Sequence, residues 1–330
     1  MARRMENDAA IFLARQMAEA AARPPQPTEA AATPGPAPAA EAPAQAGPPA
    51  SPATERPEVE ELELELLLEA LLQRFGYDFR GHERGPLKRR LRGVMAQRGL
   101  RTVSSLQDSV LHDDGAAGAL LRALHVPPSS LFDDAQEALQ LRALLGPALH
   151  ASALPRVWLA DCAGAEQAWS LAILLHEQGL LARTEIFATV ASDALLAEAR
   201  EASLPLARLE AAQQHYARGG GTGQLSDYFQ AAGPAGAQRF EPLPQLGARI
   251  IWAQYNLVTD ASFNEFQLIV CRRALPDFGP LLRQRVLQLF HASLAPFGVL
   301  GLDRVLDADD ALTAQYQPLL PELPWYKRTA

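Results

Sequence analysis

The residues best placed to do chemistry lie in a strand-like run followed by a short turn, over 156–178. An apolar run at 157–160 leads into small residues that begin with Asp161, and Glu166 then opens a stretch with helical apolar spacing. A strand, a tight turn and a helix in this order form the opening unit of a doubly wound α/β domain. The free N–H groups that start such a helix hold ligands beside the carboxyl end of the strand. The stretch therefore predicts a ligand site at this turn.

A second group of charged residues lies upstream, in a predicted helix at 87–98. Its basic residues lie outside the apolar face of that helix: Lys88, Arg89, Arg90, Arg92 and Arg98. Such a run is usually a solvated helix face, and the alternative is a surface for an acidic partner or a nucleotide phosphate. Arg272 and Arg273 would add to an anion site of this kind. No segment is a specific phosphate motif, so both interpretations stay open.

Composition excludes several classes of function. The net charge of −8 and the pI near 5.5 argue against a general nucleic-acid binder, so no DNA partner is expected. No apolar run reaches the roughly 18–20 residues that span a bilayer, and no secretory signal is evident. Cys162 and Cys271 are the only cysteines and the seven histidines are scattered, so neither a disulfide nor a metal site is expected. These features together predict a cytoplasmic protein.

The elements that must position these residues divide the chain into three parts. Residues 1–56 form a predicted Ala/Pro-rich disordered tail, with 11 of the 26 prolines at 23–57 and a short helix at 7–22. An all-α domain is predicted at 57–134, with helices at 58–76, 87–98 and 104–124. An α/β domain follows at 135–330.

Within the α/β part, apolar runs predict the strands and an amphipathic pattern predicts a late helix. The helix at 281–294 is expected to end before Pro296. Glycines and prolines at 204–246 predict an inserted lobe of β-hairpins, not a further βαβ unit. The predicted strands lie at 157–160, 184–190, 249–257, 266–271, 299–302 and 325–327.

From residue 64 to 327 the chain resembles the chemotaxis receptor methyltransferase family (CheR). The resemblance is carried in order by an arginine-rich helix around Arg89, by SSLFDD at 129–134, and by WLADCAGAEQAWSLA at 158–172. It continues with ATV at 188–190, with the pair Asn256-Leu257, and with CRRALPDF at 271–278. The resemblance implies a Rossmann-like doubly wound methyltransferase sheet with a hairpin subdomain and an all-α N-terminal domain.

The family transfers a methyl group from S-adenosylmethionine to glutamate side chains of chemoreceptors. The resemblance therefore implies S-adenosylmethionine as the cofactor and a chemoreceptor or another signalling protein as the partner. The cofactor-binding positions that this chain keeps, or changes conservatively, are Ser129, Glu166, Asn256, Leu257 and Arg272.

Other positions of the family's pocket differ in this chain. Asp133 stands where the family has arginine, and Val190 stands where an acidic residue binds the ribose hydroxyls. Asp277 replaces a tyrosine, so no catalytic residue is assigned, and Asp133 and Asp277 are the changed positions near the transferred methyl group. The losses at Val190, Asp133 and Asp161 would together weaken cofactor binding by about 4 kcal/mol, or about a thousandfold. The remaining changes are Asp161 and Ala165 for two glycines, Gln167 for glutamate, Arg273 for asparagine, and Pro276 before Asp277.

Four of the kept or changed positions also have an ordinary structural interpretation. Asp161 would cap the helix that begins near residue 165, and Val190 would fill the floor of the pocket. Glu166 would be an acid in the first turn of that helix, where the helix dipole stabilises a negative charge. Arg273 would pair with Asp277 or Asp303 across the strand ends.

Three functions remain open from the sequence. The first is a degenerate methyltransferase-fold protein that acts as a signalling adaptor or sensor in chemotaxis or surface behaviour. The second is an active protein-glutamate O-methyltransferase with an altered pocket. The third, ranked lower, is an effector that binds a nucleotide second messenger through its arginine-rich surfaces.

Overall fold

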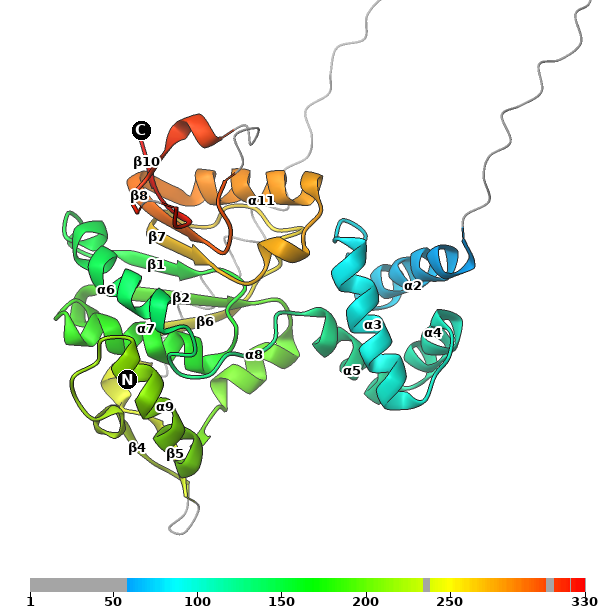
Figure 1. Cartoon of the computed structure of the whole chain (residues 1–330), viewed down its shortest axis with the longest axis horizontal. Helices are drawn as coiled ribbons and strands as arrows, with labels where there is room; N and C mark the ends of the chain where they lie inside the picture. Colours follow the sequence, from blue (N-terminus) through cyan, green and yellow to red (C-terminus); the bar gives the residue numbers. More distant parts are fainter. Residues whose placement is uncertain (1–57, 234–237, 307–311, 321, 330) are drawn as a thin grey trace, which may run out of the picture.

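A computed structural model describes residues 58–233, 238–306, 312–320 and 322–329. The predicted N-terminal tail, with its short helix and linker, lies outside these residues. Figure 1 shows a helical body at the start of the described chain, beside a sheet flanked by helices. A smaller lobe, coloured yellow-green, lies on the opposite side of the sheet domain from the C-terminus.

The helical body packs the apolar faces of four successive helices around one core. Gly76 and Gly99 end the first two helices with left-handed backbone, as glycine commonly does at this position. The predicted single helix at 104–124 is wrong, because Asp113 leaves helical geometry and its carboxylate accepts from Gly115 N to start a new helix. The helices are α2 (Val59–Phe75), α3 (Arg84–Arg98), α4 (Val103–His112) and α5 (Asp114–Leu124).

The main sheet has the order β6-β2-β1-β7-β8-β10-β9, in which β6, β2, β1, β7 and β8 are parallel and β10 is antiparallel to both of its neighbours, β8 and β9. This order confirms the predicted doubly wound, Rossmann-like class. Strand β8 begins earlier than predicted, so Pro296 lies inside it. The bounds are β1 (Arg156–Leu159), β2 (Glu185–Val190), β6 (Ile250–Gln254), β7 (Phe266–Cys271), β8 (Leu294–Leu302), β9 (Tyr316–Pro318) and β10 (Trp325–Arg328).

Helices cover both faces of this sheet, and the side chains of β1 alternate between two apolar clusters. Val157 and Leu159 join the cluster under α6 and α7, whereas Trp158 joins the cluster under α11. Burial on both faces explains why β1 reads as an unbroken apolar run. The covering helices are α6 (Ala135–Leu149), α7 (Ala165–Glu177), α8 (Asp193–Arg200) and α11 (Pro280–Ser293).

The inserted lobe combines a small antiparallel sheet of order β3-β5-β4 with a helix, α9, that the sequence did not predict. The hairpin prediction is therefore incomplete. A Cβ at Gly221 would lie 2.3 Å from the ring of Tyr216, so this position requires glycine. The Tyr216 ring packs edge-on against Phe132 at 5.1 Å between centroids, which fixes the lobe beside the main domain. The elements are β3 (Leu204–Pro205), α9 (Leu206–Arg218), β4 (Phe229–Ala232), β5 (Arg239–Pro242) and α10 (Pro244–Gly247).

Candidate functional site

The larger of two neighbouring cavities lies where the carboxyl ends of β1 and β2 meet the start of α7, and its volume is about 370 Å³. Helix α8 and the inserted lobe close its sides. This is the edge at which open α/β sheets bind ligands. Ser129, Asp161, Ala165, Glu166 and Val190 all line the cavity.

The turn after β1 is held by its own hydrogen bonds. Cys162 N donates to Thr189 O over 2.7 Å, and Ala163 N donates to the Gln167 side-chain oxygen over 2.8 Å. Asp161 has φ of +52°, in the left-handed region that favours glycine. It does not cap α7, contrary to the structural interpretation of the sequence, because Gly164 is the cap residue and no side-chain hydrogen bond caps the helix.

Glu166 fastens two neighbouring segments to the start of α7. One carboxylate oxygen accepts from Leu131 N over 2.9 Å, and the other lies 2.8 Å from the Arg208 guanidinium on α9. Burial raises the pKa of Glu166, while the bond from Leu131 and the charge of Arg208 lower it. Its position in the first turn also suits the helix dipole. Both oxygens are thus already engaged by the protein.

Val190 ends β2 with a buried aliphatic side chain. It pairs in register with Gln254 of β6, and its carbonyl accepts from Tyr255 N over 2.9 Å. Its side chain is 1% exposed and forms part of the cavity wall. The end of this strand therefore offers a ligand no carboxylate.

Asp133 and Arg273 form an ion pair of 2.6 Å between the loop before α6 and the loop after β7. The sequence interpretation that paired Arg273 with Asp277 or Asp303 is wrong. Each side chain is about one-third exposed, so solvent weakens the pair. Two positions that differ in charge from the family pattern are joined to each other.

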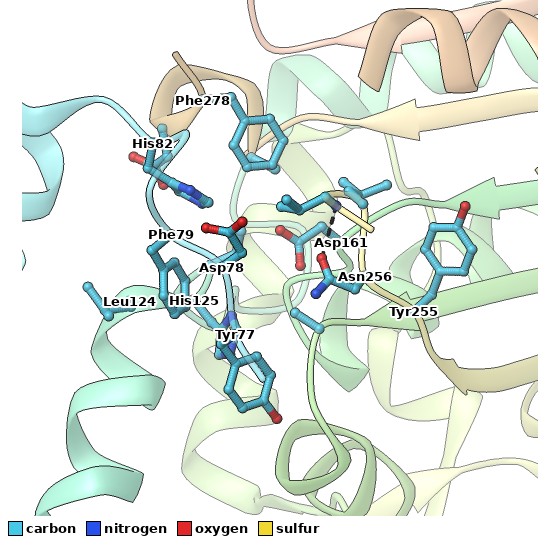
Figure 2. Close-up of a pocket in the computed structure, with 16 residues that line it drawn as sticks. Tyr77, Asp78, Phe79, His82, Leu124, His125, Asp161, Tyr255, Asn256 and Phe278 are labelled. Carbon is cyan, nitrogen blue, oxygen red and sulfur yellow. Dashed lines mark hydrogen bonds between the residues drawn. The ribbon is translucent and has the colours of Figure 1, made fainter. Parts of the chain in front are cut away.

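A smaller cavity of about 40 Å³ lies between the helical body and the sheet domain. Asp161 lines this cavity as well, together with Asn256, Leu257 and Asp277 (Figure 2). The Asn256 side-chain oxygen accepts from Val258 N over 2.9 Å, which shapes the loop after β6. Asp277 is bonded to the guanidinium of Arg90 on α3. Asn256 and Asp277 therefore already have partners within the protein.

Arg272 lines neither of these two cavities. Its guanidinium donates to Leu302 O over 2.9 Å, lies 3.4 Å from Glu137 and stacks over the Trp325 ring at 5.5 Å. Burial raises the pKa of Glu137 to about 7, and Arg272 opposes that rise. In this structure Arg272 joins α6 to the C-terminal strands.

Several residues of the site were missed from the sequence. Arg208 was missed because α9 was not predicted. His82 and His125 were read as scattered histidines, although both line the smaller cavity. The aromatic residues around positions 77–82 were the available signal for this site. Among the described residues, no cluster of histidine, cysteine and acidic side chains could hold a metal ion. No helix in the described ranges is long and apolar enough to cross a bilayer.

Comparison with known families gives two matches along the chain. Residues 130–305 match the SAM binding domain of CheR methyltransferase, and residues 62–125 match its all-alpha domain. The putative methyltransferase Cher3 of Pseudomonas putida is 35% identical over 79% of this chain and 94% of its own length. The chemotaxis protein methyltransferase 1 of Pseudomonas aeruginosa is 25% identical over 64% of this chain and 78% of its own length.

Proposed function

Since this chain belongs to the CheR methyltransferase family, we propose that it keeps the family's scaffold without methyl transfer. It acts by protein recognition, as an adaptor or sensor in chemoreceptor signalling or surface behaviour, within the cytoplasm. The observation that carries this proposal is Val190 at the end of β2, where no acidic group is available for a cofactor's ribose.

The residues present do not fit S-adenosylmethionine, although the larger cavity has the volume for a small ligand. Glu198 on the same wall is bonded to Arg122, and Glu166 is bonded to Leu131 N and Arg208. The acid that remains, Asp161, lies at the end of β1, with a left-handed backbone. A second carboxylate for the ribose is therefore missing.

The loop positions around the cavity support the same conclusion. A cation at residue 133 would attract the carboxylate of a ligand or of a substrate glutamate. Asp133 instead presents a negative charge, which Arg273 neutralises over 2.6 Å. An enzyme of this kind works largely by positioning its reactants, so the loss of these contacts lowers turnover further than it lowers binding.

Isothermal titration of the full chain with S-adenosylmethionine tests the proposal. We expect no binding tighter than the millimolar range. Val190→Asp serves as a matched variant that restores the acid at the end of β2 and should strengthen any residual binding. Micromolar binding by the unaltered chain would overturn the proposal.

Methyl transfer gives a second, independent test. The full chain is incubated with methyl-labelled S-adenosylmethionine and a chemoreceptor fragment that contains the methylated glutamates. We expect no label above that of a heat-denatured sample. Base-labile label on the fragment would establish an active enzyme.

The retained cavity favours that second function, an active protein-glutamate O-methyltransferase with altered contacts. Its volume of about 370 Å³ and the buried carboxylate of Glu166 are the specific observations on its side. Absence of both cofactor binding and methyl transfer would exclude it.

The nucleotide-effector hypothesis has less support, because much of the basic charge on α3 is already paired. Lys88 lies 2.7 Å from Glu61, Arg92 lies 2.8 Å from Glu60, and Arg90 is bonded to Asp277. We expect a thermal-shift screen of nucleotides to show no stabilisation, and a clear shift would reopen this function.

A further inference from the structure

Among the described residues, the smaller cavity has two buried ring nitrogens without a partner, whereas the larger cavity has one such side-chain atom, the Ser129 hydroxyl oxygen. His125 is 8% exposed, and its Nε2 atom forms no hydrogen bond with the described residues. The Nδ1 atom of His82 is likewise buried without a partner in the described ranges. Buried polar groups are normally hydrogen-bonded, so each such atom calls for an explanation.

Asp161 adds a carboxylate to the same cavity. No hydrogen bond or ion pair reaches it from the described part of the chain. The other two acids that line the cavity are already bonded: Asp78 to Arg80 over 3.0 Å, and Asp277 to Arg90. Arg90 is the nearby cation, and its charge is balanced by Asp277.

Five rings form a row along part of the remaining wall. Successive centroids along Tyr77, His125, Phe79, His82 and Phe278 are separated by 5.5, 5.6, 5.1 and 5.1 Å. Figure 2 shows Tyr77, Phe79, His82 and His125 from the helical body on one side, with Asp161 and Asn256 on the other. Aromatic faces attract cations, and this attraction grows when the site excludes water.

The two imidazoles are kept neutral. Burial, reinforced by the charge of Arg90, lowers the pKa of His82 and of His125 to about 4. In the tautomer that leaves the unpartnered nitrogen unprotonated, each ring offers a lone pair to a donor. The cavity thus combines hydrogen-bond acceptors, aromatic rings and a carboxylate, which is the lining that suits a cationic donor.

The size and the ligand chemistry narrow the class of cation. A volume of about 40 Å³ admits the tip of a side chain and excludes a whole cofactor. A metal ion is disfavoured, since no group of three potential ligands converges among the described residues. A lysine ammonium is compact and carries three N–H donors and no acceptor.

We propose that this cavity binds the ammonium group of a lysine side chain on a protein partner, between Asp161 and the imidazoles of His82 and His125. The inference rests on the proposed function, because it identifies the chemistry by which the chain recognises a protein. It concerns the smaller cavity, which shares Asp161 with the larger one and also contains Asn256 and Leu257, two of the cofactor-binding positions that the resemblance implies.

Nuclear magnetic resonance of the full chain with ¹⁵N-labelled histidine tests this inference. The probe is Nα-acetyl-lysine N-methylamide, and the matched controls are the norleucine and glutamate analogues. We expect the lysine probe to shift the ring-nitrogen signals of His82 and His125 and to leave the exposed His150 unchanged. The two control probes should shift neither buried ring.

Asp161→Asn is the diagnostic variant. Asparagine tolerates a positive φ, so this change preserves the backbone of the turn. We expect about tenfold weaker binding of the lysine probe. Asp227→Asn, on an exposed residue outside the cavity, should bind as the unaltered chain does.

Three outcomes would overturn the inference: no shift with the lysine probe in a folded sample, equal shifts with norleucine, or binding of free spermidine in place of the lysine probe. Titration of the same sample with S-adenosylmethionine keeps the two proposals separate. If the cofactor binds and the response to the lysine probe is intact, only the proposed loss of methyl transfer is overturned. If neither the lysine probe nor the cofactor binds, only the proposed lysine site is overturned.

Discussion

The two cavities that share Asp161 differ in how fully their polar groups are paired. In the cavity of about 370 Å³, Glu166 and Glu198 are bonded to groups of the protein, and Asp133 and Arg273 join two nearby loops. The Ser129 hydroxyl is the one buried side-chain group of this lining without a partner among the described residues. In the cavity of about 40 Å³, acceptors stay without partners. The comparison teaches that volume marks where a ligand has room, whereas unpaired buried groups mark where one is needed.

The largest expected effect tests whether the larger cavity is held together internally. Glu166→Ala would leave Leu131 N buried without an acceptor and Arg208 without its partner. We expect the free energy of unfolding to fall by about 3 kcal/mol in urea titrations. Glu201→Ala, at an exposed position, should change it by less than about 0.5 kcal/mol. Equal losses of stability in the two variants would show that the contacts of Glu166 do not hold the walls of the larger cavity together.

A second prediction concerns the unpaired acid. Burial, together with the charge of Asp277, raises the pKa of Asp161 to about 7. Its contribution to stability is therefore present below its unfolded pKa near 4 and is lost as the pH rises through about 7. Asp161→Asn should be more stable than the unaltered chain at pH 8, by about 2 kcal/mol after allowance for partial exposure. The difference should shrink towards pH 4.

In the unaltered chain, the two histidines change stability with pH in the opposite direction to Asp161. Their lowered pKa values, about 4, make the folded state lose stability as the pH falls from 6.5 towards 4. Asp277 and Asp78 line the same cavity, Arg90 is bonded to Asp277, and Asp161→Asn leaves all three residues in place. Urea titrations of both proteins at each pH therefore isolate the Asp161 contribution. A stability difference that does not vary with pH would contradict the raised pKa.

The smallest expected effect concerns the exposed ion pair. A double-mutant cycle with Asp133→Asn and Arg273→Gln should give a coupling energy of about 0.5–1 kcal/mol, falling in high salt. The exchange of the two residues, Asp133→Arg with Arg273→Asp, should recover most of this coupling. A coupling energy of zero at low salt would show that the ion pair does not hold the two loops together.

The sequence predicted the framework of the fold better than the details of the site. The unit from Val157 to Glu177 was readable because an apolar run, a small-residue turn and a helical pattern follow one another. Strand β2 was readable for the same reason. Helix α9 was not predicted, since glycines and aromatics nearby suggested hairpins. The break at Asp113 was missed although Asp113, Asp114 and Gly115 together are a cap and turn signal.

Pairings between distant residues were beyond a local pattern. Asp133 and Arg273 are 140 positions apart, and their pairing depends on how the loops around α6 and β7 meet. His82 and His125 come from separate segments of the helical body, so no spacing rule joins them. The sequence led to a prediction of which positions differ from the family, but which groups remain unpaired could be seen only in the packed structure.

The Asp133–Arg273 contact has a consequence for which substitutions the chain tolerates. Arginine at residue 133 alone would set two guanidinium groups against each other, and replacing Arg273 alone would leave the Asp133 carboxylate without its partner. Either single substitution therefore gives a less favourable protein than a change of both residues. The contact thus makes the two positions interdependent in mutational space.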